Sequence, residues 1–277
     1  MTSDTTALHP NLIAYDGVEA AGNFADPAAI VRYRAALLER SRPQAAYISR
    51  HLGKNLDVLE AAAGNGRLGF ALTECGAARS YLGVELSESR VGFARDWNRE
   101  TGGAVRVEHG DLFAYQSGGS YDLIACLTGA FAYFDPIRRD GARHVLRILS
   151  DACRPGGHVL LELYMHPARK ARCLAVPEHA VREWDRLATA DPFEYYLHEY
   201  TFDPASSWLT HHKIFVPRDL GRCCDVRTEV LRLYSAAEVT ELLAGAGLTV
   251  HRMDATWDGQ PYVDGAEVLI VVARKAA

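Results

Sequence analysis

A glycine-rich turn between a predicted strand and a predicted helix constrains the fold of this chain more than any other feature. The segment "VLEAAAGNGRLGF" covers residues 58–70, and Gly64, Gly66 and Gly69 within it follow the spacing G-x-G-x-x-G. The apolar run at 56–60 before the turn suits a short buried strand, and the residues after the turn suit a helix. This order of strand, tight turn and helix is typical of an α/β fold with a parallel sheet.

Strand and helix patterns continue to alternate after this turn. Short apolar segments predict four further strands, at 80–86, 104–111, 121–127 and 158–164. The segments between them predict helices, among them 87–102 and 135–152. Apolar strands separated by helices indicate a parallel sheet that is covered by helices on both faces.

Two other regions depart from this alternation. Residues 27–40 and 43–52 predict two helices near the N-terminus, each opened by a proline. Later in the chain, 193–202 and 208–216 read as an antiparallel hairpin, and 223–234 adds a further strand. The chain therefore inserts an antiparallel region after the fifth strand.

The alternation returns at the C-terminus, with a helix at 235–247 and strands at 248–254 and 266–274. We therefore predict four parts. They are an N-terminal helical lid (1–52), a ligand-binding core (53–164), the antiparallel insertion (165–233) and the completion of the core sheet (234–277).

A carboxylate directly before the glycine turn bears on which ligand the turn can hold. In a parallel sheet, ligands bind beyond the carboxyl ends of the strands, where we expect Glu60, Glu85 and Asp111. The glycines and Glu85 agree with a dinucleotide site, but Glu60 would repel a pyrophosphate. S-adenosylmethionine has no phosphate, and Glu60 can attract its cationic end. Glu85 can accept hydrogen bonds from both ribose hydroxyls, and Asp111 can accept one from the adenine amino group.

Five segments together resemble the successive motifs of class I S-adenosylmethionine-dependent methyltransferases. They read "LEAAAGNGR", "GVELSES", "EHGDLF", "YDLIACLTGAFAYF" and "RPGGHVLLELY", and they lie within residues 56–164. The resemblance implies a small-molecule methyltransferase with a doubly wound, mostly parallel sheet of seven strands whose last strand is antiparallel. Ala62 departs from the family's acidic-x-Gly-x-Gly-x-Gly pattern, because it stands at the first of these glycines.

The resemblance also implies which residues contact S-adenosylmethionine and its product S-adenosylhomocysteine. The loop after the first strand would line the methionine moiety, and the end of the second strand would hold the ribose. The segment after the third strand would flank adenine, and the end of the fourth strand would lie near the sulfonium. The matching residues are Glu60, Ala62, Gly64, Gly66, Glu85, Leu86, Asp111, Leu112 and Leu127. N-terminal extensions in relatives often fold over the cofactor, and Tyr15 is the contact we expect from this one.

Catalytic residues are less constrained, because transfer from a sulfonium mainly requires alignment of the acceptor. Glu162 and Tyr164 end the fifth strand and share one face. A carboxylate in this apolar strand is costly to bury unpaired, so Glu162 is either a base or a hydrogen-bonded structural group. Tyr133 follows the fourth strand and is either an acceptor contact or a packing aromatic.

The insertion supplies the remaining acceptor residues. His212 lies on the slightly more apolar face of its strand, so we expect it to point inward as a further catalytic candidate. His198 belongs to a predicted aromatic face over the pocket, although a structural role is an alternative for both histidines. Arg169, in "HPARKARC", either binds an anionic acceptor or belongs to a solvated turn.

Composition narrows the partners and the location. The net charge is −5 and basic residues are scattered, which favours a small-molecule acceptor over nucleic acid. The polar N-terminus and the lack of a long apolar run indicate no signal peptide or membrane span, so we expect a cytoplasmic protein. The six cysteines contain no C-x-x-C pair, and "CLTGAF" lacks an acidic residue of the metal-dependent catechol type. No metal is therefore expected.

The sequence leaves several alternatives open. An NAD(P)-dependent oxidoreductase and a non-catalytic S-adenosylmethionine-binding module are both compatible with parts of the pattern. The acceptor atom is oxygen, nitrogen or carbon, with secondary metabolism as one setting. Neither the acceptor nor the oligomeric state follows from the sequence.

Overall fold

Seven strands form the central sheet, in the order β10-β11-β5-β4-β1-β2-β3. The computed structural model describes residues 9–13, 19, 24, 26–187, 193–218, 221 and 223–277. All neighbouring pairs are parallel except those of β11, which runs antiparallel to β5 and to β10. The predicted doubly wound sheet is therefore confirmed. Its strands are β1 (Leu56–Ala61), β2 (Ala78–Glu85), β3 (Val105–His109), β4 (Tyr121–Cys126), β5 (Cys153–Tyr164), β10 (Leu248–Asp254) and β11 (Val268–Lys275).

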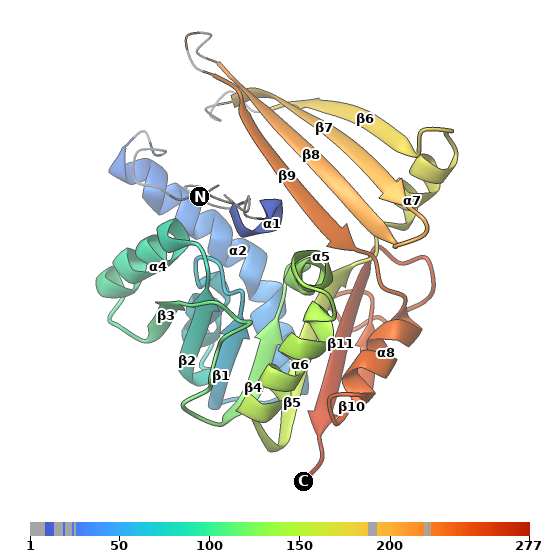
Figure 1. Ribbon diagram of the computed structural model, residues 1–277. Helices are drawn as coiled ribbons and strands as arrows, with labels where there is room; N and C mark the ends of the chain where they lie inside the picture. The colour runs from blue at the N-terminus through green and yellow to red at the C-terminus, as the bar shows by residue number, and fades with distance from the viewer. Residues whose placement is uncertain are drawn as a thin grey trace, which may run out of the picture.

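Helices cover both faces of this sheet, because its strands are apolar on both sides. Along β1, Val58 packs into one buried apolar cluster and Leu59 into the other. On the Val58 side lie α2 (Pro27–His51), α3 (Arg67–Glu74) and α4 (Glu88–Glu100) (Figure 1). On the Leu59 side lie the one-turn helix α5 (Phe134–Ile137) and the longer helices α6 (Gly141–Ala152) and α8 (Ala236–Ala244).

One helix replaces the two that the N-terminal prolines predict. Helix α2 continues through Pro43, so the predicted break between 40 and 43 is wrong. Pro43 removes one backbone hydrogen bond from the helix. Residues on both sides of it are buried, including Leu37 before it and Ile48 after it. Tertiary packing of both halves therefore outweighs the local cost of the proline.

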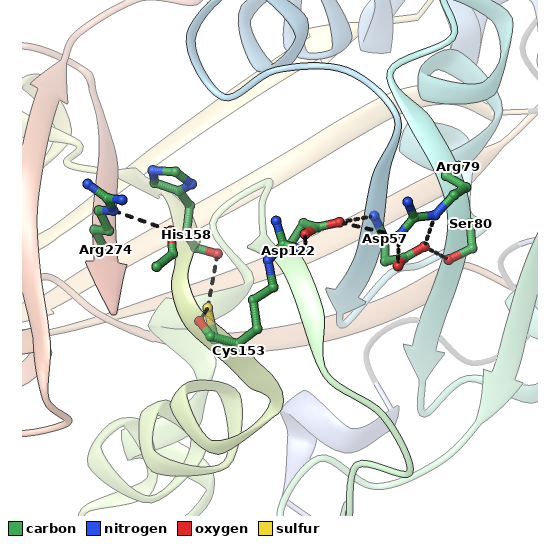
Figure 2. A network of polar contacts seen from close by, with 9 residues as sticks. Asp57, Arg79, Ser80, Asp122, Cys153, His158 and Arg274 are labelled. Carbon is green, nitrogen blue, oxygen red and sulfur yellow. Dashed lines mark hydrogen bonds and ion pairs between the residues drawn. The ribbon is translucent and has the colours of Figure 1, made fainter. Parts of the chain in front are cut away.

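A polar network joins the amino ends of the parallel strands, opposite the end where ligands bind in such sheets (Figure 2). The backbone N–H of Asp57 donates to Asp122 Oδ2 at 2.7 Å, which links β1 to β4. Asp57 Oδ1 accepts from Arg79 Nε at 3.0 Å and from Ser80 Oγ at 2.7 Å. Arg154 forms an ion pair with the buried Asp122. These contacts join four neighbouring strands, β2, β1, β4 and β5, where each begins.

A second sheet of four antiparallel strands stands over the opposite end of the core sheet (Figure 1). Its strands are β6 (Ala180–Arg186), β7 (Phe193–Asp203), β8 (Trp208–Pro217) and β9 (Asp225–Arg232). The hairpin β7–β8 and strand β9 lie where the sequence predicts them, whereas β6 and helix α7 (Pro167–Leu174) were not predicted. Phe202, Leu209 and Leu231 bury one end of this sheet against Ala132, in the short helix η2 (Ala130–Tyr133).

Candidate functional site

A cavity of about 560 Å³ lies at the carboxyl ends of the parallel strands. The turns after β1, β2, β3 and β4 and the carboxyl end of β5 all contribute to its lining. The structure thus brings together most of the site residues that the sequence predicts. Those that line the cavity are Glu60, Ala62, Gly64, Glu85, Leu86, Asp111, Leu112, Leu127, Tyr133, Glu162 and Tyr164.

The turn after β1 follows a left-handed path. Ala62, Gly64 and Gly66 have φ angles of 53°, 58° and 72°, the region that favours glycine. Ala62 thus adopts a conformation that glycine takes more readily, at some cost in strain. Gly66 does not line the cavity but begins α3, and a Cβ there would lie 2.8 Å from Val107 Cγ2. Gly66 therefore serves close packing.

Glu85, at the end of β2, holds this turn in place. Its Oε2 accepts from the Gly64 N–H at 2.8 Å, and its Oε1 accepts from the Ser87 N–H at 2.9 Å. A carboxylate has about four acceptor positions, so each oxygen keeps capacity for a ligand. The backbone on both sides fixes the buried carboxylate before any ligand arrives.

Glu60 is a buried carboxyl group at the start of the same turn. Burial raises the pKa of Glu60 to about 8, although a hydrogen bond from the Tyr81 hydroxyl and the charge of Arg67 act in the opposite direction. The group is therefore mostly protonated at neutral pH. A cationic ligand beside it would favour the charged form.

Glu162 connects three separate segments at the cavity wall. It accepts hydrogen bonds from the Thr128 N–H at 2.7 Å, from Gln44 Nε2 at 3.3 Å and from Trp257 Nε1 at 3.1 Å. Burial raises the pKa of Glu162, while these three hydrogen bonds lower it. Glu162 is thus a hydrogen-bonded carboxylate that also lines the cavity.

Two tyrosines lie on the same wall. Tyr164 packs against Gly129, where a Cβ would lie 2.6 Å from the tyrosine ring. Burial raises the pKa of Tyr164 to about 12, so its phenol keeps its proton at neutral pH. Tyr133 ends η2 and lines the cavity as well.

One face of α2 forms a wall that sequence reasoning missed. Tyr33, Leu37, Arg40 and Gln44 line the cavity, and their spacing places them on one side of a helix. The helical spacing of these four residues is visible in the sequence, but it does not by itself distinguish a ligand-facing side from a packed one. Arg40 and Arg67 bring positive charge to a cavity that otherwise carries several carboxylates.

The N-terminal segment also reaches the cavity. In helix α1 (Pro10–Ile13), Asn11 donates through Nδ2 to the Val230 carbonyl at 2.7 Å and accepts from the Val230 N–H at 2.7 Å. Asn11 itself lines the cavity, so this segment links strand β9 to the site. Tyr15 lies outside the described residues, and its contact with a cofactor stays a prediction.

Glu19 joins the same segment to the other side of the cavity. It accepts hydrogen bonds from Tyr33 Oη at 3.0 Å and from Asn65 Nδ2 at 2.8 Å. Arg90 Nε lies 3.2 Å from its Oε2. Sequence reasoning missed Glu19, because its partners come from three separate segments of the chain.

The second sheet presents His211 inward, and the predicted inward position of His212 is wrong. The register pairs Tyr200 with His211, and His211 is buried on the same face as His198. His212 lies on the opposite face, where its Nδ1 is 3.0 Å from Thr228 Oγ1. The inward face can be polar because its groups pair with one another. The role proposed for His212 depended on its position and is withdrawn.

The inward face carries the predicted aromatic cluster. His198 Nδ1 lies 3.2 Å from Tyr200 Oη, and its Nε2 lies 3.0 Å from Asp185 Oδ2. The ring centroids of Tyr200 and His211 are 4.2 Å apart. Arg169, on α7, lies with its guanidinium carbon 4.5 Å from the Tyr200 ring centroid. Neither His198 nor Arg169 lines the 560 Å³ cavity.

Within the described ranges, no three His, Cys, Asp or Glu side chains are grouped as metal ligands. Among the helices of the described chain, none is both long enough and apolar enough to span a membrane.

Comparison with known proteins identifies similar chains. Residues 58–157 match the sequence family described as a methyltransferase domain. The CcbJ methyltransferase from Streptomyces caelestis superimposes with a TM-score of 0.73 at 20% identity, over 86% of this chain and 90% of that one. An S-adenosylmethionine-dependent methyltransferase from Clostridium acetobutylicum gives a TM-score of 0.70 at 17% identity, over 86% and 92%.

A third similar structure is described as a sugar-modifying enzyme. CalS10 from Micromonospora echinaspora, an amino pentose methyltransferase of calicheamicin biosynthesis solved with S-adenosylmethionine bound, gives a TM-score of 0.63 at 16% identity, over 92% of this chain and 99% of that one. No curated protein matches the chain. At these identities the structural likeness shows a shared fold.

Proposed function

Residues 58–157 of this chain are a methyltransferase domain of the class I fold, and on this premise we propose that the protein transfers the methyl group of S-adenosylmethionine to a small-molecule acceptor. The observation that carries the proposal is the pair of buried carboxyl groups, Glu60 and Glu85, at the glycine turn of one cavity. Glu60 stands where a dinucleotide would place its pyrophosphate and suits a cationic ligand instead, and Glu85 suits the ribose of a nucleoside.

The residues around the cavity fit this ligand. S-adenosylmethionine supplies a methyl group that is already activated for transfer to a nucleophile. Glu85 keeps free acceptor positions for two ribose hydroxyls, and Asp111, which lines the same cavity, would accept from the adenine amino group. Glu60 attracts the ammonium end of the ligand. Arg40 and Arg67 offer cations to its carboxylate.

The remaining polar residues of the cavity are assigned to the acceptor. Glu162 holds the wall at the ends of β4 and β5, and Tyr133 and Tyr164 contact the acceptor beside it. We propose the same four parts as the sequence predicts. The core (53–164) binds the cofactor, and the insertion (165–233) forms most of the acceptor pocket. The N-terminal part (1–52) covers the site, and the C-terminal part (234–277) completes the sheet.

A small-molecule acceptor is in keeping with the activities given for the similar structures. Among them are CalS10, the sugar N-methyltransferase KedS8 from a Streptoalloteichus species and the glycopeptide N-methyltransferase MtfA. We extend their setting, secondary metabolism, to this chain as part of the proposal. The net charge of −5 supports a small molecule over nucleic acid. The six cysteines are all free, which supports a reducing, cytoplasmic location.

Titration calorimetry tests the cofactor assignment directly. The full chain, cleared of co-purified ligand, is titrated in parallel with S-adenosylmethionine, S-adenosylhomocysteine and NADH. We expect micromolar binding of both sulfur compounds and no heat from NADH. Binding of NADH alone would overturn the proposal in favour of an oxidoreductase. Binding of the sulfur compounds without turnover of any acceptor would favour a non-catalytic module.

A further inference from the structure

A second cavity, of about 540 Å³, adjoins the first. It lies between α7, β6 and the end of β5, and Arg169, Arg172 and Glu183 contribute to its lining. Tyr164 lines both cavities. The two cavities therefore meet at this residue.

Arg169 is held in a fixed orientation at this cavity. Its Nη1 donates to His166 Nδ1 at 3.1 Å, and its guanidinium lies over the ring of Tyr200. Burial lowers the pKa of His166 to about 4, and the charge of Arg169 lowers it further, so the imidazole is neutral and can accept this bond. The imidazole therefore orients the arginine without adding a charge.

The two arginines that line this cavity differ in their ion pairing. Over the part of the chain that the structure describes, no carboxylate lies within ion-pair distance of Arg169. Arg172, less than one turn later on α7, forms an ion pair with Glu183. Glu267 also lines the cavity but is exposed, so solvent screens its charge.

The arginine has the donors that an oxyanion requires. A guanidinium carries five N–H groups in a planar fork, and the bond to His166 uses one of them. Such a fork binds a carboxylate or a phosphate through two parallel hydrogen bonds. Because His166 and Tyr200 already fix the side chain, less conformational entropy is lost when an anion binds.

We propose that the acceptor carries an oxyanion group, a carboxylate or a phosphate, which binds Arg169 in the second cavity while the methylated atom lies in the first. This inference rests on the proposed methyltransferase function and adds a substrate class to it. The anionic group anchors the acceptor, and Tyr164 contacts the part of the acceptor between the two cavities.

Two anionic probes, each with a neutral counterpart, test the inference. The full chain saturated with S-adenosylhomocysteine is titrated with 4-aminobenzoate, 4-aminobenzamide, phenyl phosphate and phenol. We expect at least one anion to bind about 10-fold or more tightly than its neutral counterpart, and the stronger of the two anions identifies the group. Equal affinity within both pairs, including no measurable binding of any probe, overturns the inference.

Variants of α7 assign the preference to Arg169. Arg169→Gln is expected to remove the preference for the anion, and Arg169→Lys to restore part of it. Lys170→Gln changes an exposed cation on the same helix that does not line this cavity, and it should keep the full preference. A preference that persists in Arg169→Gln overturns the inference.

The same titrations separate this inference from the proposed function. S-adenosylhomocysteine binding and the thermal unfolding midpoint are measured for every variant. Normal cofactor binding without an anion preference overturns only the role of Arg169. Failure of the wild-type chain to bind S-adenosylhomocysteine overturns the proposed function, and the anion titration is then read on the unliganded chain.

Discussion

Glu85 Oε2 accepts a hydrogen bond from the backbone N–H of Gly64 at 2.8 Å, so the residue that ends β2 fixes the turn that follows β1. The two residues are 21 positions apart. Parallel pairing of β1 with β2 brings them to the same edge of the sheet. The shape of the cofactor turn thus depends on a side chain from the neighbouring strand.

Replacement of Glu85 by Ala should weaken S-adenosylmethionine binding strongly. The variant loses the acceptor for the ribose and also the support of the glycine turn. Loss of a hydrogen-bonded carboxylate of this kind costs about 2–3 kcal/mol, or roughly 100-fold in Kd. Calorimetry measures the change, and Glu88→Ala, at an exposed position of α4, is the matched control. An unchanged Kd would contradict the role of Glu85.

The buried Glu60 should make the stability of the unliganded protein fall as pH rises. In the unfolded chain this carboxyl loses its proton near its ordinary pKa of about 4.5, whereas in the folded chain it keeps the proton up to about pH 8. The free energy of unfolding therefore falls as the pH rises from the unfolded to the folded pKa of Glu60. The loss is about 3 kcal/mol from pH 5.5 to pH 8. Urea unfolding of the wild type and of Glu60→Gln measures this slope. Equal slopes in the wild type and in Glu60→Gln would contradict the prediction. The exposed Glu241→Gln, on α8, is the control and should show the slope of the wild type.

Cofactor binding should release a proton from Glu60 at pH 7. The cationic ligand favours the charged carboxylate, so the pKa of Glu60 falls when the ligand binds. The binding enthalpy of S-adenosylmethionine should then change with the ionisation enthalpy of the buffer. Calorimetry in phosphate and in Tris reveals the proton, and Glu60→Gln should abolish the difference. The same enthalpy in both buffers for the wild type would show that Glu60 keeps one protonation state.

Glu162→Gln should destabilise the fold as well as disturb the acceptor wall. A glutamine cannot accept all three hydrogen bonds from Thr128, Gln44 and Trp257, because its amide nitrogen is a donor. One unsatisfied buried group costs about 2 kcal/mol, or roughly 4–8 °C in the thermal midpoint. Scanning calorimetry measures the shift, with the exposed Glu178→Gln as control. A midpoint within 1 °C of the wild type would count against the structural role.

Asp122→Ala should lower stability without changing the cofactor affinity. The variant leaves the Asp57 N–H and Arg154 without their partner at the amino ends of the strands. We expect a loss of about 2 kcal/mol. Because the network lies at the opposite end of the sheet from the cavity, the Kd for S-adenosylmethionine should stay within about twofold. The exposed Asp151→Ala, on α6, is the control for stability. A large change in cofactor affinity would show that the two ends are coupled.

The fold and the part of the cavity lining at the strand ends could be predicted from the sequence, because the signals involved are local. Apart from Tyr15, each predicted cofactor residue lies at or just after the end of an apolar strand. In a parallel sheet all such ends meet at one edge. The place of Glu60, Glu85 and Asp111 around one cavity follows from that rule and from the order of the strands.

Long-range partners could not be predicted in the same way. Gln44 and Trp257 are 118 and 95 residues from Glu162, and no local pattern links them to it. The choice between His211 and His212 failed because the inward face of the second sheet is polar. There the polar groups are satisfied across strands, as in the ion pair of Lys213 with Glu229, so apolarity does not mark the buried face.

Strand β6 escaped prediction because its sequence lacks apolar alternation. Its residues are mostly charged and half-exposed, and they pair across the strands through ion pairs such as Arg182–Glu199. Pro43 misled the prediction for the opposite reason. The local signal for a break was strong, but the burial of both halves of α2 outweighed it.

The paired hydrogen bonds of Asn11 with Val230 also protect the second sheet. Strand β9 is the last strand on its side, and an edge strand with unpaired N–H and C=O groups invites the strand of another molecule. Asn11 occupies both backbone groups of Val230 through its side chain, as a neighbouring strand would do. A single amide from a one-turn helix thus closes this part of the edge against intermolecular pairing and aggregation.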